Sequence, residues 1–318
     1  MNKLSVLLVL LAANTQASWA ADEIPLGFAW PDGLRATVHQ VKSKTKDPGT
    51  PGAQTTQVAM TYPMTAARND KGFVVTFGKL AFEDSLLASM APAERVQFET
   101  MTQAGLPAMQ VSPAGEFLAI HDLPLFRATL RAAMLPLAPK GDATLDRFME
   151  QFVSEPLLTG LAANDWGLIV GNWAGNQLEP GATYRASYSA ALPLVSGPAI
   201  KMVARFTLVR SLPCTRGGVA RDCVELEMNT VPDAADMARA IQDWMKALAS
   251  DATAQVRQPE VKDLDLRTSL RLVTERATLI PHNYTYSKFT RMTVNADGKE
   301  QVSAQEEKAT VRYSYDGT

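Results

Sequence analysis

"LRTSLRLVTERATLIPHNYTYSKFTRMTVNADGKEQVSAQEEKATVRYSYD", residues 266–316, is the stretch of the chain that decides its fold. Polar and apolar residues alternate along most of it, with the period of two that is typical of β-strands with one solvated and one buried face. Within it, "NADGK" contains Asp297-Gly298, a common hairpin turn. The stretch therefore predicts long antiparallel strands joined by short loops.

The same alternation predicts strands in two earlier parts of the chain. Residues 33–84 contain three alternating runs, which predict three antiparallel strands. From residue 165 to about Val231 the period of two returns, and strands are expected to continue through a hairpin. A shorter hairpin is predicted around Ser112-Pro113-Ala114-Gly115, because Pro and Gly stand at favoured turn positions.

Between these strands, apolar residues at helical spacing predict helices. Residues 91–105 have Pro92 near the start and Gly105 just after the end, an arrangement typical of a helix. Further helices are predicted in residues 123–135, before Pro136, and from an N-cap at Asp142 through residue 163. A last helix is predicted in residues 233–250.

The order of elements indicates the fold class. Helices do not alternate one for one with strands, which argues against a doubly wound parallel sheet and favours an α+β fold. We expect a large curved, half-barrel-like antiparallel sheet with helices packed on one face. Residues 21–318 are expected to form a single domain, with a helical segment at about 92–163.

The first twenty residues predict a secretory signal peptide. Lys3 precedes an apolar run of about ten residues, and Ser18 and Ala20 supply the small residues of a cleavage site. Because this run is too short to span a bilayer of about 30 Å, cleavage after Ala20 is expected, leaving a soluble mature protein in the periplasm without a membrane span.

The net charge of the chain does not favour a polyanionic partner. The chain has 31 Lys and Arg against 33 Asp and Glu, and removal of Lys3 with the leader leaves a slight acidic excess. Nothing in this balance favours nucleic acid or an anionic membrane surface.

Both cysteines, Cys214 and Cys223, lie in "LPCTRGGVARDC" between two β-rich runs. Their spacing is not that of a redox CxxC pair, and a zinc site would need two more ligands from three isolated histidines. In an exported chain the pair favours a disulfide across a hairpin.

Catalytic signatures are missing. No phosphate loop, dinucleotide fingerprint, HExxH, GxSxG or SxxK motif stands in the chain. His39, His121 and His282 have no nucleophile beside them in the sequence. The sequence therefore predicts a non-enzyme, with no catalytic residues, metal or cofactor.

Large apolar side chains are the strongest remaining signal. Aromatic and Met residues at helical spacing are usually core, but flexible Met side chains also suit a cavity for a lipid or another hydrophobic small molecule. On that second interpretation, segments 122–163 and 232–249 cover the sheet above an apolar cavity of several hundred Å³. The candidate ligand-binding residues are Phe126, Leu130, Met134, Phe148, Met149, Phe152, Trp166, Trp173, Trp244 and Met245.

Several segments carry a resemblance to known proteins. "VTFGKLAFE", "QVSPAGEFLAIHD", "WAGNQLEPGATYRASY" and the closing strands, in this order, resemble secreted bacterial proteins of unknown function. More distantly, the order of elements is similar to that of periplasmic lipoprotein carriers, in which helices close an antiparallel half-barrel over an apolar cavity. The resemblance implies a periplasmic fold and a role with hydrophobic ligands, and carries no catalytic residues.

Two other functions remain open at this stage. Exposed strand edges or helix faces could dock an envelope protein. A hydrolase would need a His and an acid brought by the fold next to a nucleophile.

Overall fold

The structure, a computed structural model, describes residues 23–83, 86, 90–102, 105–135, 145–146, 149–150, 153–190, 200–251, 260–296 and 299–315. Side chains at a few further positions inside helices and strands, including 243–250, are not described. The predicted leader, residues 1–20, lies outside these ranges.

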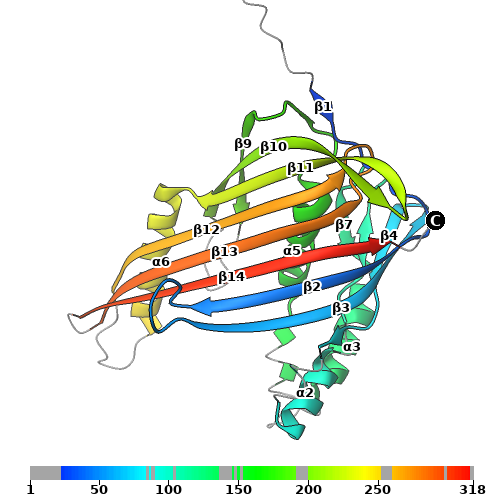
Figure 1. Cartoon of the computed structure of the whole chain (residues 1–318). Coiled ribbons are helices and arrows are strands. Elements are labelled where there is room, and N and C mark those ends of the chain that lie inside the picture. Colours follow the sequence, from blue (N-terminus) through cyan, green and yellow to red (C-terminus); the bar gives the residue numbers. More distant parts are fainter. Residues whose placement is uncertain are drawn as a thin grey trace, which may run out of the picture.

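The described strands form one large antiparallel sheet and one small pair (Figure 1). The order in the large sheet is β7-β6-β4-β3-β2-β14-β13-β12-β11-β10-β9, and β5 pairs with β3 beside this path. The sheet is open, since β7 and β9 end it and do not pair with each other. Its strands are β2 (Leu34–Lys46), β3 (Gln54–Asn69), β4 (Gly72–Phe77), β5 (Ala81–Phe82), β6 (Met109–Val111), β7 (Phe117–Ile120), β9 (Thr183–Ala190), β10 (Ile200–Arg216), β11 (Val219–Pro232), β12 (Glu260–Glu275), β13 (Pro281–Ala296) and β14 (Lys299–Tyr315); the small pair is β1 (Ile24–Pro25) with β8 (Gln177–Leu178).

Helices α5 (Glu155–Trp166) and α6 (Ala234–Asp251) lie on the same side of this sheet (Figure 1). Helices α2 (Pro92–Thr102), α3 (Leu123–Met134) and α6 match predicted helices closely. In Figure 1, α6 lies near the ends of the strands that meet at the β13–β14 hairpin, and α5 lies nearer their other ends. Among the described residues, no helix has the length and apolar character needed to cross a membrane.

Two sequence predictions are wrong in the middle of the chain. A single helix up to residue 163 is interrupted, because Ser154 has extended backbone and α5 begins afterwards with a Pro in its first turn. Residues 167–171, predicted to begin a strand, form a turn of π-helix that continues α5. Trp166, Leu168 and Val170 are all buried there, and a short apolar run does not distinguish a strand from a buried helix.

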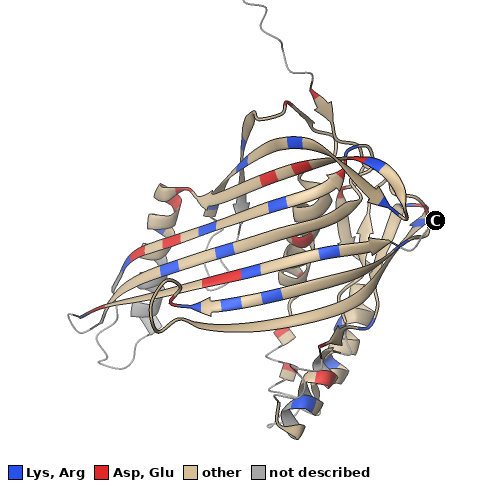
Figure 2. Ribbon diagram, viewed as in Figure 1, with Lys and Arg blue, Asp and Glu red and all other residues tan. Residues whose placement is uncertain are grey.

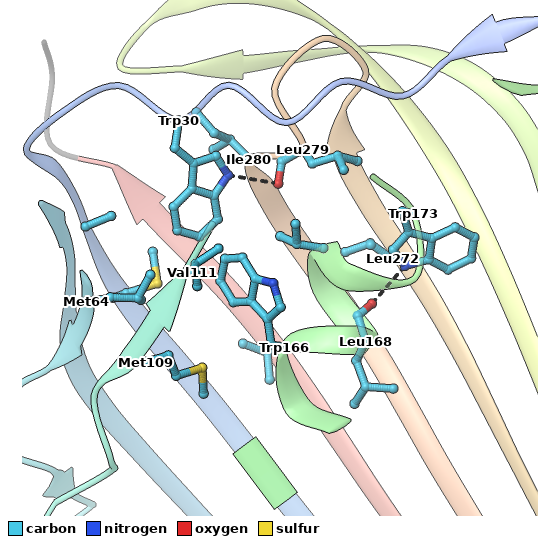
Figure 3. Close-up of a cluster of buried hydrophobic side chains, with 14 of the residues drawn as sticks. Trp30, Met64, Met109, Val111, Trp166, Leu168, Trp173, Leu272, Leu279 and Ile280 are labelled. Carbon is cyan, nitrogen blue, oxygen red and sulfur yellow. Dashed lines mark hydrogen bonds between the residues drawn. The ribbon is translucent and has the colours of Figure 1, made fainter. Parts of the chain in front are cut away.

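Three buried tryptophans organise the main core (Figure 3). Trp30 and Trp166 meet edge to face, with ring centroids 5.3 Å apart. The indole of Trp30 donates to the Leu279 carbonyl (3.3 Å), and that of Trp173 donates to the Leu168 carbonyl (3.0 Å). The core therefore joins the sheet to α5 without leaving these indole nitrogens unpaired.

The opposite face of the sheet, which we call the outer face, is polar. Cross-strand hydroxyl pairs such as Ser269 and Ser287 lie on it (3.0 Å). Glu225 there binds Arg210 (2.6 Å) and Arg271 (2.7 Å) across three strands. The alternation in the sequence thus sorts side chains into an outer face that is solvated and a helix-side face that carries the core.

The disulfide is confirmed: Cys214 and Cys223 are bonded to each other and link β10 to β11 near their hairpin turn.

Candidate functional site

Two groups of polar side chains stand out against the apolar interior. The first surrounds Glu275, at the end of β12. Glu275 accepts hydrogen bonds from Arg216 Nε (2.7 Å) and Thr278 Oγ1 (2.8 Å). His282 Nε2 lies 3.6 Å from Glu275 Oε1, too far for a hydrogen bond.

These neighbours set the ionisation of the carboxyl group. Burial alone would raise the pKa of Glu275, but His282, Arg216 and Thr278 together outweigh it and hold the pKa at about 2. A carboxylate this acidic is a weak general base near neutral pH. The group therefore ties the end of β12 to β10 and to the following loop.

The same region contains a group of metal-ligand types. The sulfurs of Cys214 and Cys223 and a ring nitrogen of His282 lie within 4.8 Å of one another. Both sulfurs are used in the disulfide, however, and a metal would need thiolates. As it stands, the group does not offer a metal-ligand set.

The second group crosses the helix-side face, and we call it the polar row. Strand register places Thr230 of β11 opposite Thr268 of β12, and Thr268 opposite Lys288 of β13. Lys288 lies opposite Glu307 of β14, and Glu307 opposite Lys44 of β2. Figure 2 shows the acidic positions of β14 with basic positions on both neighbouring strands. The polar row thus runs across five neighbouring strands.

Strand periodicity fixes the face on which the polar row lies. Lys288 is two residues from Tyr286, and Glu307 is four residues from the buried core residue Val311. Successive side chains point to opposite faces, so residues an even number apart share one. The negative charge of Glu307 also helps to raise the pKa of Tyr286, after burial as the main cause, which agrees with a shared face.

On one side of the polar row lies Asp165 of α5. Burial raises the pKa of Asp165, and the positive charge of Lys42 and a hydrogen bond from Asn164 partly offset this. The Asp165 residue as a whole is nevertheless exposed to water. Its carboxylate therefore has protein on one side and solvent on the other.

Tyrosines from two strands of the sheet surround Asp165. Burial, and then the charge of Asp165, raise the pKa of Tyr62 to about 12. Burial is also the largest cause for Tyr284 and Tyr286, with Asp165 among the smaller ones, and the pKa of Tyr286 is raised to about 12. Both Tyr284 and Tyr286 are half-buried. Their hydroxyl groups remain protonated at neutral pH, and can donate hydrogen bonds.

On the other side of the polar row lies a smaller apolar cluster beneath α6. Met237 and Ala240 of α6 pack against Ile200 and Met202 of β10. The half-buried Leu264 and Leu266 of β12 extend this cluster. Tyr188 of β9, opposite Met202, is 46% exposed. Charged and aromatic groups with access to water therefore lie between two apolar surfaces.

The ten apolar residues predicted to bind a ligand do not gather at one place. Trp166 and Trp173 are fully buried in the main core. Leu130, Met134 and Met149 belong to a separate small cluster, in which α3 packs against Leu145, Met149 and Val153. They are thus divided between two packed regions.

The remaining predicted residues add nothing to a common site. Phe126 is half-buried on α3. Trp244 and Met245 lie on α6, with side chains outside the described part of the chain, and Phe148 and Phe152 lie outside it entirely.

Two cavities among the described residues lie elsewhere than predicted. One, of about 210 Å³, is lined by β2, β3 and β5, including His39 and Thr61. The other, of about 320 Å³, is lined by Arg127, Ala128 and Arg131 of α3 and by Asp146, Met149 and Glu150. Neither lies between α6 and the sheet.

Sequence reasoning missed the polar row and Asp165. The signal was present in "YTYSK", residues 284–288, where Tyr284, Tyr286 and Lys288 share one face by alternation. Alternation does not tell which face the helices cover, and charged positions are normally assigned to the solvated one.

Comparison with known proteins adds no family: no family model matches the chain, and no curated protein is similar to it.

Proposed function

We propose that this protein is a periplasmic, non-enzymatic binding protein that holds an amphipathic, lipid-like ligand on the helix-side face of its sheet. The ligand would lie between α5 and α6, along the polar row. The observation that carries this proposal is the placement of partly exposed Tyr188, Tyr286 and Lys288 on the face that otherwise carries the core.

Polar groups on such a face need a physical reason. Covering a lysine or a tyrosine hydroxyl without a partner costs free energy, so apolar residues are the normal choice beneath helices. A face that changes from apolar to polar and back matches a ligand that is itself both apolar and polar. In this proposal the open sheet supports a hydrophobic ligand, which is the role that the resemblance to lipoprotein carriers implied.

The location rests on two features of the chain. The leader has the composition of a signal peptide, and the Cys214–Cys223 disulfide is typical of proteins in oxidising compartments.

The test is native mass spectrometry of protein purified from its own periplasm, with lipid extraction from the same sample. We expect a co-purifying amphiphile at near one per chain. Tyr286→Ala should reduce its occupancy. Phe289→Ala is the matched control, because Phe289 is an aromatic residue of the same strand whose ring faces Arg267 on the outer face (4.6 Å). A ligand-free mass for the unaltered protein under gentle conditions would refute the proposal.

One observation favours a second candidate, an envelope protein-interaction module. β9 ends the described sheet and pairs only with β10, so its other edge offers backbone groups to an added strand. Ser187→Pro in β9 should then weaken capture of a partner and leave ligand occupancy unchanged. If the unaltered protein and Ser187→Pro capture the partner equally well, β9 is excluded as the docking edge.

A further inference from the structure

We propose that the ligand is a long-chain amphiphile with an anionic head group, and that Lys42, Lys44 and Lys288 hold this group. This inference rests on the proposed function and adds the chemical class of the ligand. It is carried by strand register, by the absence of ion pairs and by the surfaces beside the lysines.

Register gathers the three lysines around one acid. Glu307 of β14 lies directly between Lys44 of β2 and Lys288 of β13. Lys42 is two residues from Lys44 and opposite Ala309, so it shares the face and lies next to the pair. The direct cross-strand neighbours on one face are about 5 Å apart at Cβ, within reach of a single head group for side chains as long as lysine.

None of the three lysines is neutralised by a close partner. Within the described part of the chain, none has a carboxylate oxygen within 4 Å. Glu307 instead accepts a hydrogen bond from Gln305 Nε2 (2.6 Å). Lys46, on the same face two residues beyond Lys44, adds a further positive charge opposite Gln305. The positive charges on this part of the face therefore exceed the negative ones, Asp165 included.

The residues next to the lysines offer a hydrogen-bond donor and an apolar surface for the acyl chain of such an amphiphile. Tyr286 lies one position along β13 from Lys288 on the same face, and can donate a hydrogen bond from its hydroxyl. In the other direction, Leu266 and Met202 lead to the apolar cluster beneath α6. An acyl chain could contact this cluster while its head group stays at the lysines.

The charges also argue against a cationic head group. Asp165, whose charge acts on Tyr62 and Tyr284, already feels the positive charge of Lys42 and has a hydrogen bond from Asn164. A bound cation would be repelled by three lysines and could pair with only two acids, Glu307 and Asp165. An anion would pair with the lysines and face only partial repulsion from Glu307.

The experiment measures binding of oleate and of oleyl alcohol to delipidated full-length mature protein by native mass spectrometry and calorimetry, below the aggregation concentration of each. The two probes share one chain and differ in head-group charge. The variant is Lys44→Gln/Lys288→Gln, and the matched control is Lys308→Gln, a lysine of β14 on the outer face that pairs with Glu306 (2.9 Å). Circular dichroism and a thermal melt establish that each variant is folded.

We expect oleate to bind at least about tenfold more tightly than oleyl alcohol, and the double variant to lose about tenfold in oleate affinity, as expected for the loss of charge-assisted hydrogen bonds. Lys308→Gln should bind oleate like the unaltered protein. Oleate affinity should also fall as salt concentration rises, because exposed charges are screened.

Two outcomes would overturn different parts of the argument. If oleyl alcohol binds as tightly as oleate, or if the double variant keeps full oleate affinity, the head-group assignment is wrong while a lipid-binding function stands. If neither probe binds to a folded protein, the proposed function and this inference both fail.

Discussion

The indole nitrogen of Trp166 in α5 donates a hydrogen bond of 2.7 Å to the carbonyl oxygen of Gly115, in the turn between β6 and β7. This bond is buried and joins residues 51 positions apart. It fixes α5, and with it Asp165, against the edge of the sheet.

Trp166→Phe should therefore destabilise the protein by about 1–3 kcal/mol, because the Gly115 carbonyl is left buried without a partner. Urea unfolding measures the loss, and hydrogen exchange should show faster opening of residues 109–120. Trp173→Phe is the comparison, since the Trp173 indole donates to the carbonyl of Leu168, five residues away. Equal exchange of residues 109–120 in both variants would contradict the role given to the Trp166 bond.

Gly72 should not tolerate a side chain. Its φ is +127°, and an added Cβ would collide with the backbone carbonyl oxygen of Val111 in the neighbouring strand. We expect Gly72→Ala to lower the free energy of unfolding by more than 2 kcal/mol, since backbone atoms cannot move aside cheaply. Gly105→Ala is the control, because Gly105 also has positive φ but open space around it. A thermal melt that ranks the two variants equally would disprove the steric argument.

Glu275 should make stability depend on pH in the acid range. Its pKa falls from 4.5 to about 2 in the folded protein, so the folded state binds fewer protons than the unfolded state between these values. The stabilisation is complete above about pH 5 and is lost as pH falls toward 2. Glu275→Gln should remove this dependence, and lower stability at pH 7 by on the order of 2–3 kcal/mol.

Urea unfolding of Glu275→Gln between pH 2 and pH 7 measures this effect. Glu300→Gln is the control, since Glu300 pairs with Lys262 at the surface (2.6 Å) and its side chain is 60% exposed. If Glu275→Gln still loses stability steeply at acid pH, the loss must be assigned to other carboxyl groups.

The disulfide should stabilise the protein without taking part in binding. Cys214 and Cys223 are nine residues apart, and closing a loop of this size contributes about 2.5–3 kcal/mol in the chain-entropy model. The double variant Cys214→Ser/Cys223→Ser should lose about this amount in urea unfolding and keep its ligand occupancy. Loss of ligand from a variant that is still folded would show that the hairpin end contributes to binding.

Much of the fold could be predicted because its main elements have clear periods. The structure has strands where β12 to β14 alternate and a helix where α6 has helical spacing, since each of these elements has one covered and one solvated face. The interruption at Ser154 was missed because apolar spacing continues across it. The π-helical turn at residues 167–171 was missed because its residues are buried on nearly every side.

The candidate site could not be predicted in the same way. The polar row consists of residues from five strands, so it exists only once the register between those strands is known. The tryptophans singled out from the sequence proved to fill the core. Lys288 and Glu307, in contrast, were indistinguishable from the charged residues of an ordinary solvated face.

The position of β14 has a consequence for the order of folding. This last described strand lies in the interior of the sheet and pairs on one side with β2, so that Ala304 exchanges hydrogen bonds with Asp47 across 257 residues. Ladders such as β2–β3, β10–β11 and β13–β14 can form early from nearby segments, but the two halves of the sheet stay separate until β14 pairs with β2. Contacts so distant in sequence make folding slow. A chain that completes its sheet only with its last described strand is expected to stay incompletely folded for longer than one built from local hairpins alone.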